Sequence, residues 1–179
     1  VGALIVDLHQ PIVLLTPEGR EEEVVTRLAR VGYDNTLGYL KGGIEAWTAT
    51  GRAVDTIESV TADELALRLK VGVVDNYLDV RKPSEYLSHH ALSAQNFPLD
   101  YINNNMYKLD ARQKYYVQCL GGYRSMIMAS ILKARGFQNV VDVYGGWRAV
   151  EESQVPKTDF VCPTTIPQEI IDDAMAAAY

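Results

Sequence analysis

The sequence contains few cysteines, no excess of positive charge and no long apolar run. Its two cysteines, Cys119 and Cys162, are too few for a disulfide framework and lack the spacing of metal-ligand motifs. We therefore expect no metal centre and no cofactor, and we predict a reducing, cytoplasmic location. The formal net charge of −6 and the lack of a basic stripe argue against nucleic-acid binding.

Membrane insertion is not expected either. No apolar stretch approaches the ~20 residues that a membrane-spanning helix needs, and no secretory signal is visible. The 179 residues, 47% of them hydrophobic and 22% charged, have the composition of a globular protein with its own core.

The stretch around Cys119 carries the strongest chemical signal. An apolar run over 115–118 predicts a buried strand, and residues 126–132 predict a helix, with a glycine-containing loop between them. The N–H groups of such a loop and the positive end of the helix favour an anionic sulfur, which lowers the pKa of the thiol. The alternative is a buried, unreactive cysteine before an ordinary turn.

Part of the chain is repeated. The segment 28–35 is similar to the segment 132–139, with Gly32 placed 104 residues before Gly136. Each copy predicts the order strand, loop, helix, strand, Gly-Gly, helix. The corresponding positions are Leu15 and Cys119, Arg20 and Arg124, and, after a one-residue insertion, Gly42-Gly43 and Gly145-Gly146.

The unequal extent of the copies predicts the domain organisation. Residues 1–50 are interpreted as a partial copy, the carboxy-terminal half of a domain whose opening half is missing, and residues 51–57 as a linker. Residues 58–153 are interpreted as the complete domain, and 154–179 as an extended tail with a carboxy-terminal helix. Because a half sheet leaves strand edges unpaired, we expect the partial copy to pack on the second copy or on an upstream segment.

Strands and helices alternate along the complete domain. Thr61 and Glu64 fit a capping box that begins a helix, and Pro83 fits the first turn of another. Strand character is predicted at 73–74 and 77–80, and at an edge position for 96–99. This order predicts an α/β fold with a mostly parallel central sheet and Cys119 at the carboxyl ends of the strands.

These residues resemble the rhodanese (sulfurtransferase) family. The loop 119–125, Cys-Leu-Gly-Gly-Tyr-Arg-Ser, is similar to that family's Cys-x-Gly-Gly-x-Arg-Ser loop. The resemblance covers about 59–153 and implies a three-layer rhodanese-like fold with helices on both faces of the sheet. It also implies a tandem-repeat protein whose first copy, with Leu15 in place of cysteine, is degenerate and inactive. The other matching segments are Leu78-Asp79-Val80-Arg81, His90 to Leu99 with departures at Ala91, Leu92 and Ser93, and Gly145-Gly146-Trp147.

The resemblance implies a sulfurtransferase with Cys119 as the catalytic nucleophile. The Cys119 thiolate takes sulfane sulfur from thiosulfate, a polysulfide or a persulfide, holds it as a persulfide and passes it to a thiol or to cyanide. Small sulfur donors and thiol acceptors are thus the expected partners. The loop residues expected to surround the charged sulfur are Leu120, Gly121, Gly122, Tyr123, Arg124 and Ser125.

Two other functions remain open. One is a non-turnover sulfur carrier or regulatory module, because the region also resembles the part that follows a metallo-β-lactamase-fold domain in persulfide dioxygenase-like fusion proteins. A missing or fused amino-terminal metal-binding domain is then a further partner. The other is a cysteine phosphatase, which is disfavoured because Cys119 and Arg124 have four residues between them, whereas related phosphatases have five. An oligomer is compatible with either function.

Several residues around the loop have alternative roles. Arg124 braces the loop, or pairs with a carboxylate such as Asp79, or does both. Asp79 and Arg81 are assigned mainly to support of the structure and His90 to packing. Cys162 is either a resolving thiol for Cys119 or a tail cysteine packed against the body. The residues expected to crowd the corresponding anion site of the first copy are Glu18, Glu21, Glu22 and Glu23.

Overall fold

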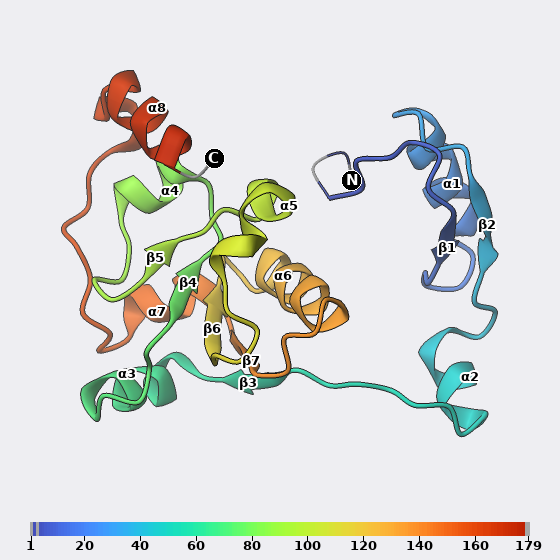
Figure 1. Cartoon of the computed structure of the whole chain (residues 1–179), viewed down its shortest axis with the longest axis horizontal. Helices are drawn as coiled ribbons and strands as arrows, with labels where there is room; N and C mark the ends of the chain where they lie inside the picture. The colour runs from blue at the N-terminus through green and yellow to red at the C-terminus, as the bar shows by residue number, and fades with distance from the viewer. Residues whose placement is uncertain (1, 3, 178–179) are drawn as a thin grey trace. The chain divides into compact units, whose positions relative to one another are not determined.

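The chain forms two compact units in the computed structural model, which describes residue 2 and residues 4–177. The first unit extends to Thr56 and the second begins at Ile57. Figure 1 shows the helices and strands of each unit. No helix in the described part of the chain is long and apolar enough to cross a membrane.

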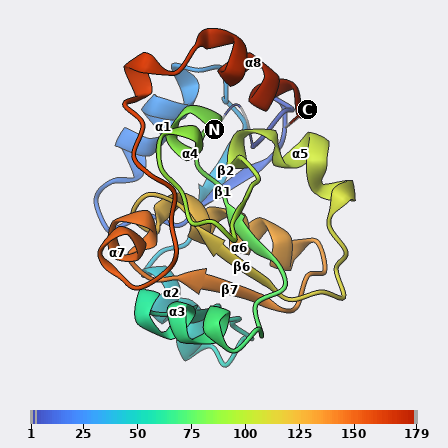
Figure 2. The same cartoon turned by 90° about the vertical axis from the view of Figure 1, so that its left-hand side faces the viewer.

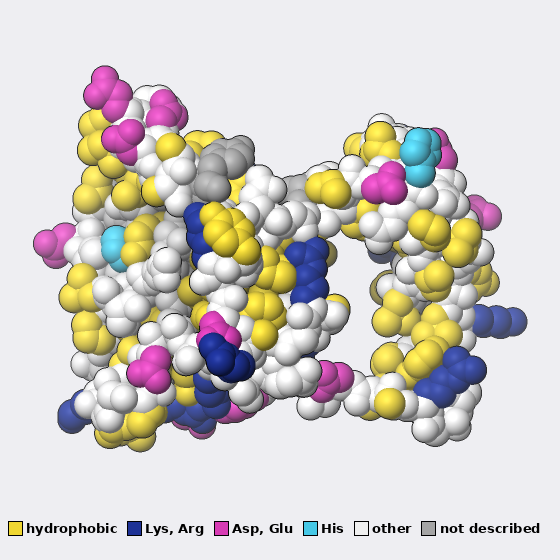
Figure 3. Space-filling view, in the orientation of Figure 1, with side chains coloured by type: hydrophobic (Ala, Val, Ile, Leu, Met, Phe, Trp, Pro, Cys, Tyr) yellow, Lys and Arg dark blue, Asp and Glu magenta, His cyan; other side chains and the backbone are white. Residues whose placement is uncertain are grey.

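The first unit contains a two-stranded parallel sheet and two helices. Its buried core is small and is formed by Leu14, Leu28 and Tyr33. Figure 3 shows hydrophobic side chains across the visible face of this unit, and Val13 and Leu37 of its two strands are 68% and 67% exposed. Its elements are β1 (Ile12–Leu14), α1 (Glu21–Ala29), β2 (Thr36–Tyr39) and α2 (Gly43–Ala49).

The second unit is built on five parallel strands in the order β3-β7-β6-β4-β5. The central strands β6 and β7 are buried at every position, as expected where helices cover both faces of a parallel sheet. Parallel pairing places the carboxyl ends of all five strands at one edge. The strands are β3 (Glu58–Val60), β4 (Tyr77–Asp79), β5 (Gln95–Asn96), β6 (Tyr115–Gln118) and β7 (Val140–Val143).

Helices lie on both faces of this sheet. One face packs against α6, which contacts β6 and β7, and the other packs against α3 and α7. Figure 2 shows β7 ending beside α7, the helix that follows it. The helices are α3 (Ala62–Lys70), α4 (Pro83–Ser88), α5 (Ile102–Asn105), α6 (Tyr123–Ala134), α7 (Gly146–Glu152) and α8 (Gln168–Ala177), with short 3₁₀ helices at η1 (Leu99–Tyr101), η2 (Met106–Lys108) and η3 (Pro163–Thr165).

The α/β fold predicted from the sequence is confirmed, with helices on both faces of a parallel sheet. The capping box at the start of α3 is also present, because the Thr61 hydroxyl accepts from the Glu64 N–H at 3.2 Å and the Glu64 carboxylate accepts from the Thr61 N–H at 2.8 Å. The predicted edge strand is β5, which ends before Pro98.

One predicted strand is wrong. Residues 73–74 lie in an irregular segment after α3, because the helix ends at Lys70 and Gly72 turns the chain with a φ of 72°. The short strand β3 and the helical turns between Leu99 and Lys108 were not predicted, since none of these segments has a clear hydrophobic period.

Candidate functional site

Cys119 lies at the centre of the sheet edge where the strands end. It follows β6 directly, and β6 pairs with β7 on one side and β4 on the other. Its side chain is almost completely buried, with 2% of the residue exposed. The chain then turns through Gly122, whose φ of 101° leads into α6. The predicted strand-loop-helix arrangement is therefore present.

The loop directs hydrogen-bond donors at the sulfur. The Gly122 N–H donates to Cys119 Sγ at 3.2 Å. Burial by itself would raise the pKa of Cys119, but the N–H groups of Ser125, Gly121 and Gly122 and the Ser125 hydroxyl favour the thiolate. Their combined effect outweighs burial and lowers the pKa below that of an ordinary cysteine. The thiolate is the nucleophilic form of cysteine.

Helix α7 supports the cysteine loop by donating hydrogen bonds to the carbonyl groups of the loop. The Trp147 N–H donates to the Cys119 carbonyl at 2.6 Å, and the Arg148 N–H donates to the Leu120 carbonyl at 3.2 Å. A Cβ on Gly146 would overlap the Cys119 carbonyl oxygen and come within 2.9 Å of the Gly121 nitrogen. The Gly-Gly-Trp segment thus permits close packing of α7 under the cysteine loop.

Arg124 pairs with a carboxylate, which was one of the two alternatives, but this carboxylate is Glu85 and not Asp79, the example named for that alternative. Nη1 and Nη2 of the Arg124 guanidinium donate to the two Glu85 carboxylate oxygens at 2.7 and 2.8 Å. Burial alone would raise the pKa of Glu85, but Arg124 outweighs it, and the pKa is lowered. This pair connects the first turn of α6 to α4. Glu85 was visible in the sequence only as a helix residue after Pro83.

Asp79 forms its ion pair with Arg81. Its carboxylate lies 2.7 Å from an Arg81 guanidinium nitrogen, and both side chains are buried. Gln118, the residue before the cysteine, donates to the same carboxylate at 3.1 Å, and Arg81 also donates to the His89 carbonyl at 2.8 Å. Asp79 is the last residue of β4, so these contacts lie at the strand end next to β6, and the supporting role assigned to Asp79 and Arg81 stays a prediction.

A second buried carboxylate, Asp142 of β7, was missed by the sequence reasoning. Its Oδ1 accepts from the Ser125 hydroxyl at 2.6 Å, and its Oδ2 lies 3.3 Å from the Ser59 hydroxyl. The Ser125 hydroxyl has one proton, and the carboxylate is its stronger acceptor. The backbone N–H groups are therefore the main donors to the Cys119 sulfur. The only sequence signal for Asp142 is an acidic residue inside an apolar strand.

His90 and Cys162 lie in different surroundings. The His90 ring stacks on Tyr86 at a centroid distance of 3.7 Å, and its Nδ1 lies 2.6 Å from the Tyr86 carbonyl, as expected of a packing residue. The expectation that Cys162 packs against the body is wrong, because Cys162 is exposed and its sulfur contacts the Thr164 hydroxyl at 3.1 Å. Both cysteines are free. A resolving role for Cys162 stays a prediction.

The cavity beside the cysteine is small. It has a volume of about 270 Å³ and opens over the loop. Arg148, which the sequence reasoning did not select, lies on its wall. The lining residues are Cys119, Leu120, Gly121, Tyr123, Arg124 and Arg148.

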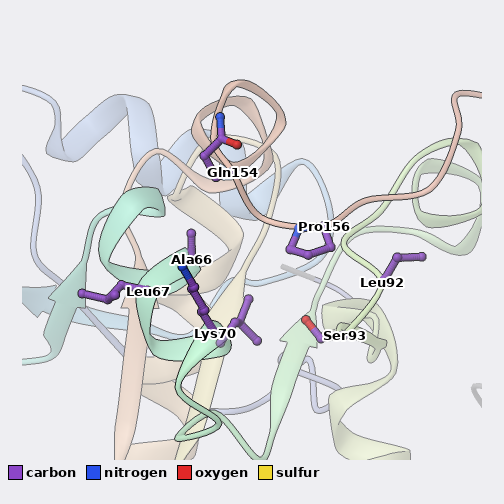
Figure 4. A pocket seen from close by; sticks show the side chains of 8 residues that line it. Ala66, Leu67, Lys70, Leu92, Ser93, Gln154 and Pro156 are labelled. Carbon is purple, nitrogen blue, oxygen red and sulfur yellow. The ribbon is translucent and has the colours of Figure 1, made fainter.

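A larger cavity of the second unit lies elsewhere. It has a volume of about 670 Å³ and is formed by α3, the loop at Leu92 and Ser93, and the segment from Gln154 to Pro156 (Figure 4). Its lining contains no cysteine, histidine or carboxylate. Within residues 2 and 4–177, no group of three or more His, Cys, Asp or Glu side chains is placed to hold a metal ion. The candidate chemistry is therefore concentrated at Cys119.

Comparison with known proteins agrees with this geometry. The family model of the Rhodanese-like domain matches residues 61–153, about half of the chain. This chain belongs to the rhodanese-like family. A rhodanese-like domain protein from Staphylococcus aureus has a similar structure, with a TM-score of 0.50 and 32% identity over 52% of this chain and 91% of that one. A rhodanese-related protein from Thermoplasma volcanium has a TM-score of 0.51 and 30% identity over 56% and 97% of the two chains.

Two Bacillus subtilis proteins match the rhodanese-like domain in sequence. The "Putative sulfur carrier protein YrkF" is 33% identical over 73 residues, which is 41% of this chain and 40% of that protein. The "Uncharacterized protein YqhL" is 28% identical over 71 residues, 40% of this chain and 56% of that protein. The chain thus spans only about half the length of these relatives.

Proposed function

We propose that this protein is a sulfurtransferase that carries sulfane sulfur on Cys119. The observation that carries the proposal is the buried Cys119 sulfur, which lies at the end of β6 with loop N–H groups directed at it and a lowered pKa. Membership of the rhodanese-like family supports the same chemistry.

The reaction consists of two displacements at sulfur. The Cys119 thiolate attacks the outer sulfur of the donor, a bond forms between the two sulfurs, and the donor's own S–S bond breaks. Thiosulfate leaves as sulfite, and a persulfide donor leaves as its thiolate, so no external oxidant or reductant is required. An acceptor thiolate or cyanide then attacks the terminal sulfur and releases the Cys119 thiolate. The loop N–H groups stabilise the negative charge on the terminal sulfur between the two steps.

The direct test is detection of the added sulfur. The full chain is incubated with thiosulfate, with polysulfide and with glutathione persulfide, and Cys119 is examined by peptide mass spectrometry for the mass of one extra sulfur atom. Cys119→Ser is expected to lose the label and to lower sulfur transfer by about 10³-fold or more, as removal of a nucleophile does. Cys162→Ser is the matched thiol control and should retain the label on Cys119, and an unchanged rate of sulfur transfer in this variant would exclude a resolving role for Cys162. An unlabelled Cys119 with all three donors would reject the proposal.

A second candidate is a sulfur carrier without free turnover. The name of one Bacillus subtilis relative favours it. Both functions require the Cys119 persulfide, so they differ only in what happens next. Rapid transfer to glutathione or cyanide with many turnovers indicates an enzyme, whereas a stable persulfide released only to a protein partner indicates a carrier.

We also propose that residues 1–50 are a degenerate rhodanese-like copy and that the protein acts together with a further domain, such as the metal-binding domain of a persulfide dioxygenase-like fusion. The order of elements supports the degenerate copy, because β1-α1-β2-α2 repeats the order β6-α6-β7-α7 and both strand pairs are parallel.

A further inference from the structure

The two guanidinium groups in the Cys119 cavity have different electrostatic surroundings. Arg124 has its charge matched by Glu85, which binds it through two nitrogens at 2.7 and 2.8 Å. Arg148 lines the same cavity, and the ion pairs among the described residues include no carboxylate for its guanidinium. The nearby Glu151 is paired with His89 instead. Arg148 is thus the uncompensated positive charge of the cavity wall.

The position of Arg148 is coupled to that of the loop. Its backbone N–H donates to the Leu120 carbonyl at 3.2 Å, one residue after the nucleophile. The preceding N–H, of Trp147, holds the Cys119 carbonyl itself. The base of the Arg148 side chain therefore keeps a fixed place relative to the sulfur. The other walls of the cavity at Leu120 and Tyr123 are uncharged, so they supply no competing anion site.

We infer that Arg148 selects sulfur donors whose leaving group carries an anionic oxygen group, a sulfonate or a carboxylate, by pairing with that group while the outer sulfur faces Cys119. This inference rests on the proposed sulfur transfer and names the donor class for it. A guanidinium binds a planar or tetrahedral oxyanion through two parallel N–H groups. In thiosulfate the bound group leaves as sulfite, and in an acidic thiol persulfide it leaves as the carboxylate-bearing thiolate. The uncharged side chains of the loop, Leu120 and Tyr123, do not themselves indicate a preference for anionic leaving groups.

The expected effect is a change in donor binding. Hydrogen bonds to charged groups correspond to about 10- to 150-fold in an equilibrium constant. Arg148→Gln should therefore lower kcat/KM for thiosulfate by about 10- to 100-fold, chiefly through KM, and Arg148→Lys should recover part of this loss. With a donor whose leaving group carries no anionic oxygen group, such as the persulfide of N-acetylcysteine methyl ester, the change should stay within about twofold, because no contact to an oxyanion is lost.

The matched control is Arg112→Gln. It removes the same charge, but Arg112 is exposed and lies before the amino end of β6, at the opposite edge of the sheet from Cys119. Equal losses for Arg148→Gln with thiosulfate and with the donor that lacks an oxyanion would overturn the inference, as would no loss with thiosulfate.

A binding measurement separates failure of this inference from failure of the proposed function. Sulfite is titrated by calorimetry against Cys119→Ser, which cannot transfer sulfur, and against the Cys119→Ser, Arg148→Gln double variant. Weaker sulfite binding in the double variant by about tenfold or more supports an anion-binding role for Arg148, even if no donor labels Cys119 in the wild-type protein. Equal sulfite binding by both variants rejects the role of Arg148, even if sulfur transfer proceeds.

Discussion

The first unit has the same order of elements as the part of the second unit from β6 to α7, but the two differ in how much of the molecule supports the loop. In the second unit the loop rests on α7, is connected to α4 through Arg124 and Glu85, and directs N–H groups at a buried sulfur. In the first unit the corresponding residue is Leu15, which is 58% exposed. The two units therefore differ in the contacts that hold the loop as well as in the presence of a nucleophilic cysteine.

The corresponding cavity of the first unit is acidic. It has a volume of about 370 Å³, and Glu18, Glu21 and Glu45 line it together with Lys41. Two of the four glutamates expected there, Glu22 and Glu23, do not line it. Glu23 is bound instead by Arg20 and Arg27 of its own helix region. Arg20 therefore makes a local ion pair, whereas its counterpart Arg124 makes a tertiary one. The loop around Cys119 therefore depends on contacts from distant parts of the chain. Four predictions test this difference between the units.

The largest effect is expected at the second glycine of each Gly-Gly pair. Gly146→Ala should destabilise the second unit by about 2–4 kcal/mol, because its Cβ overlaps the loop backbone and the residue has a φ of 59°. Gly43→Ala should cost the first unit only about 1–2 kcal/mol, because its Cβ meets only the movable Glu45 side chain, although its φ is 67°.

Tryptophan fluorescence during denaturant unfolding measures these two changes. Trp47 reports on the first unit and Trp147 on the second, and Trp47→Phe isolates the second signal. Equal losses from Gly146→Ala and Gly43→Ala would show that α7 does not support the loop as described.

The next effect is expected at the arginine of each loop. Arg124→Gln leaves the half-buried Glu85 without its partner and should destabilise the second unit by about 1–2 kcal/mol, less than for a fully buried pair because both side chains are near 30% exposed. Arg20→Gln should have no measurable effect, since its pair with Glu23 is solvent-screened. The same unfolding measurement compares the two, and a larger effect at Arg20 would contradict the assignment.

A smaller effect concerns the pKa of the nucleophile. The Ser125 hydroxyl donates mainly to Asp142 and makes a smaller contribution than the backbone N–H groups together in favouring the Cys119 thiolate, so Ser125→Ala should raise the pKa of Cys119 only slightly. A higher pKa leaves less thiolate at neutral pH, and the rise of the persulfide-forming rate with pH should move to higher pH. Ser130→Ala, whose hydroxyl binds only the Met126 carbonyl of the same helix, is the control and should leave the profile in place. A downward shift for Ser125→Ala would be the contrary result.

The smallest effect is expected from restoring a cysteine to the first unit. Leu15→Cys in the Cys119→Ser background should take up no sulfur, because glutamates line the neighbouring cavity and repel an anionic donor. The new thiol should behave as an ordinary exposed cysteine, with a few per cent thiolate at pH 7. Persulfide on the introduced thiol at a level comparable to that on Cys119 in the wild type would show that the nucleophile alone separates the units.

Much of this site could be predicted from local sequence. Cys119 and the glycines of its loop were placed between a strand and a helix because short-range periodicity and turn residues report on neighbouring positions. The carboxylate that binds Arg124 was not identified from the sequence, and Asp142 and Arg148 were not predicted at all. Glu85 lies on α4, whereas Asp142 on β7 and Arg148 on α7 both follow the α6 crossover, so the sheet topology brings all three to the loop.

The nucleophile, the size of its loop and the α/β order of elements follow from local sequence, because these properties depend on residues close together in the chain. Tertiary structure decided which charges meet at the cavity. Parallel pairing brings the ends of β4, β6 and β7 to one edge, where Glu85 binds Arg124, and Arg148 lines the cavity without a carboxylate. Such pairings depend on packing between distant segments, and spacing along the chain does not encode them.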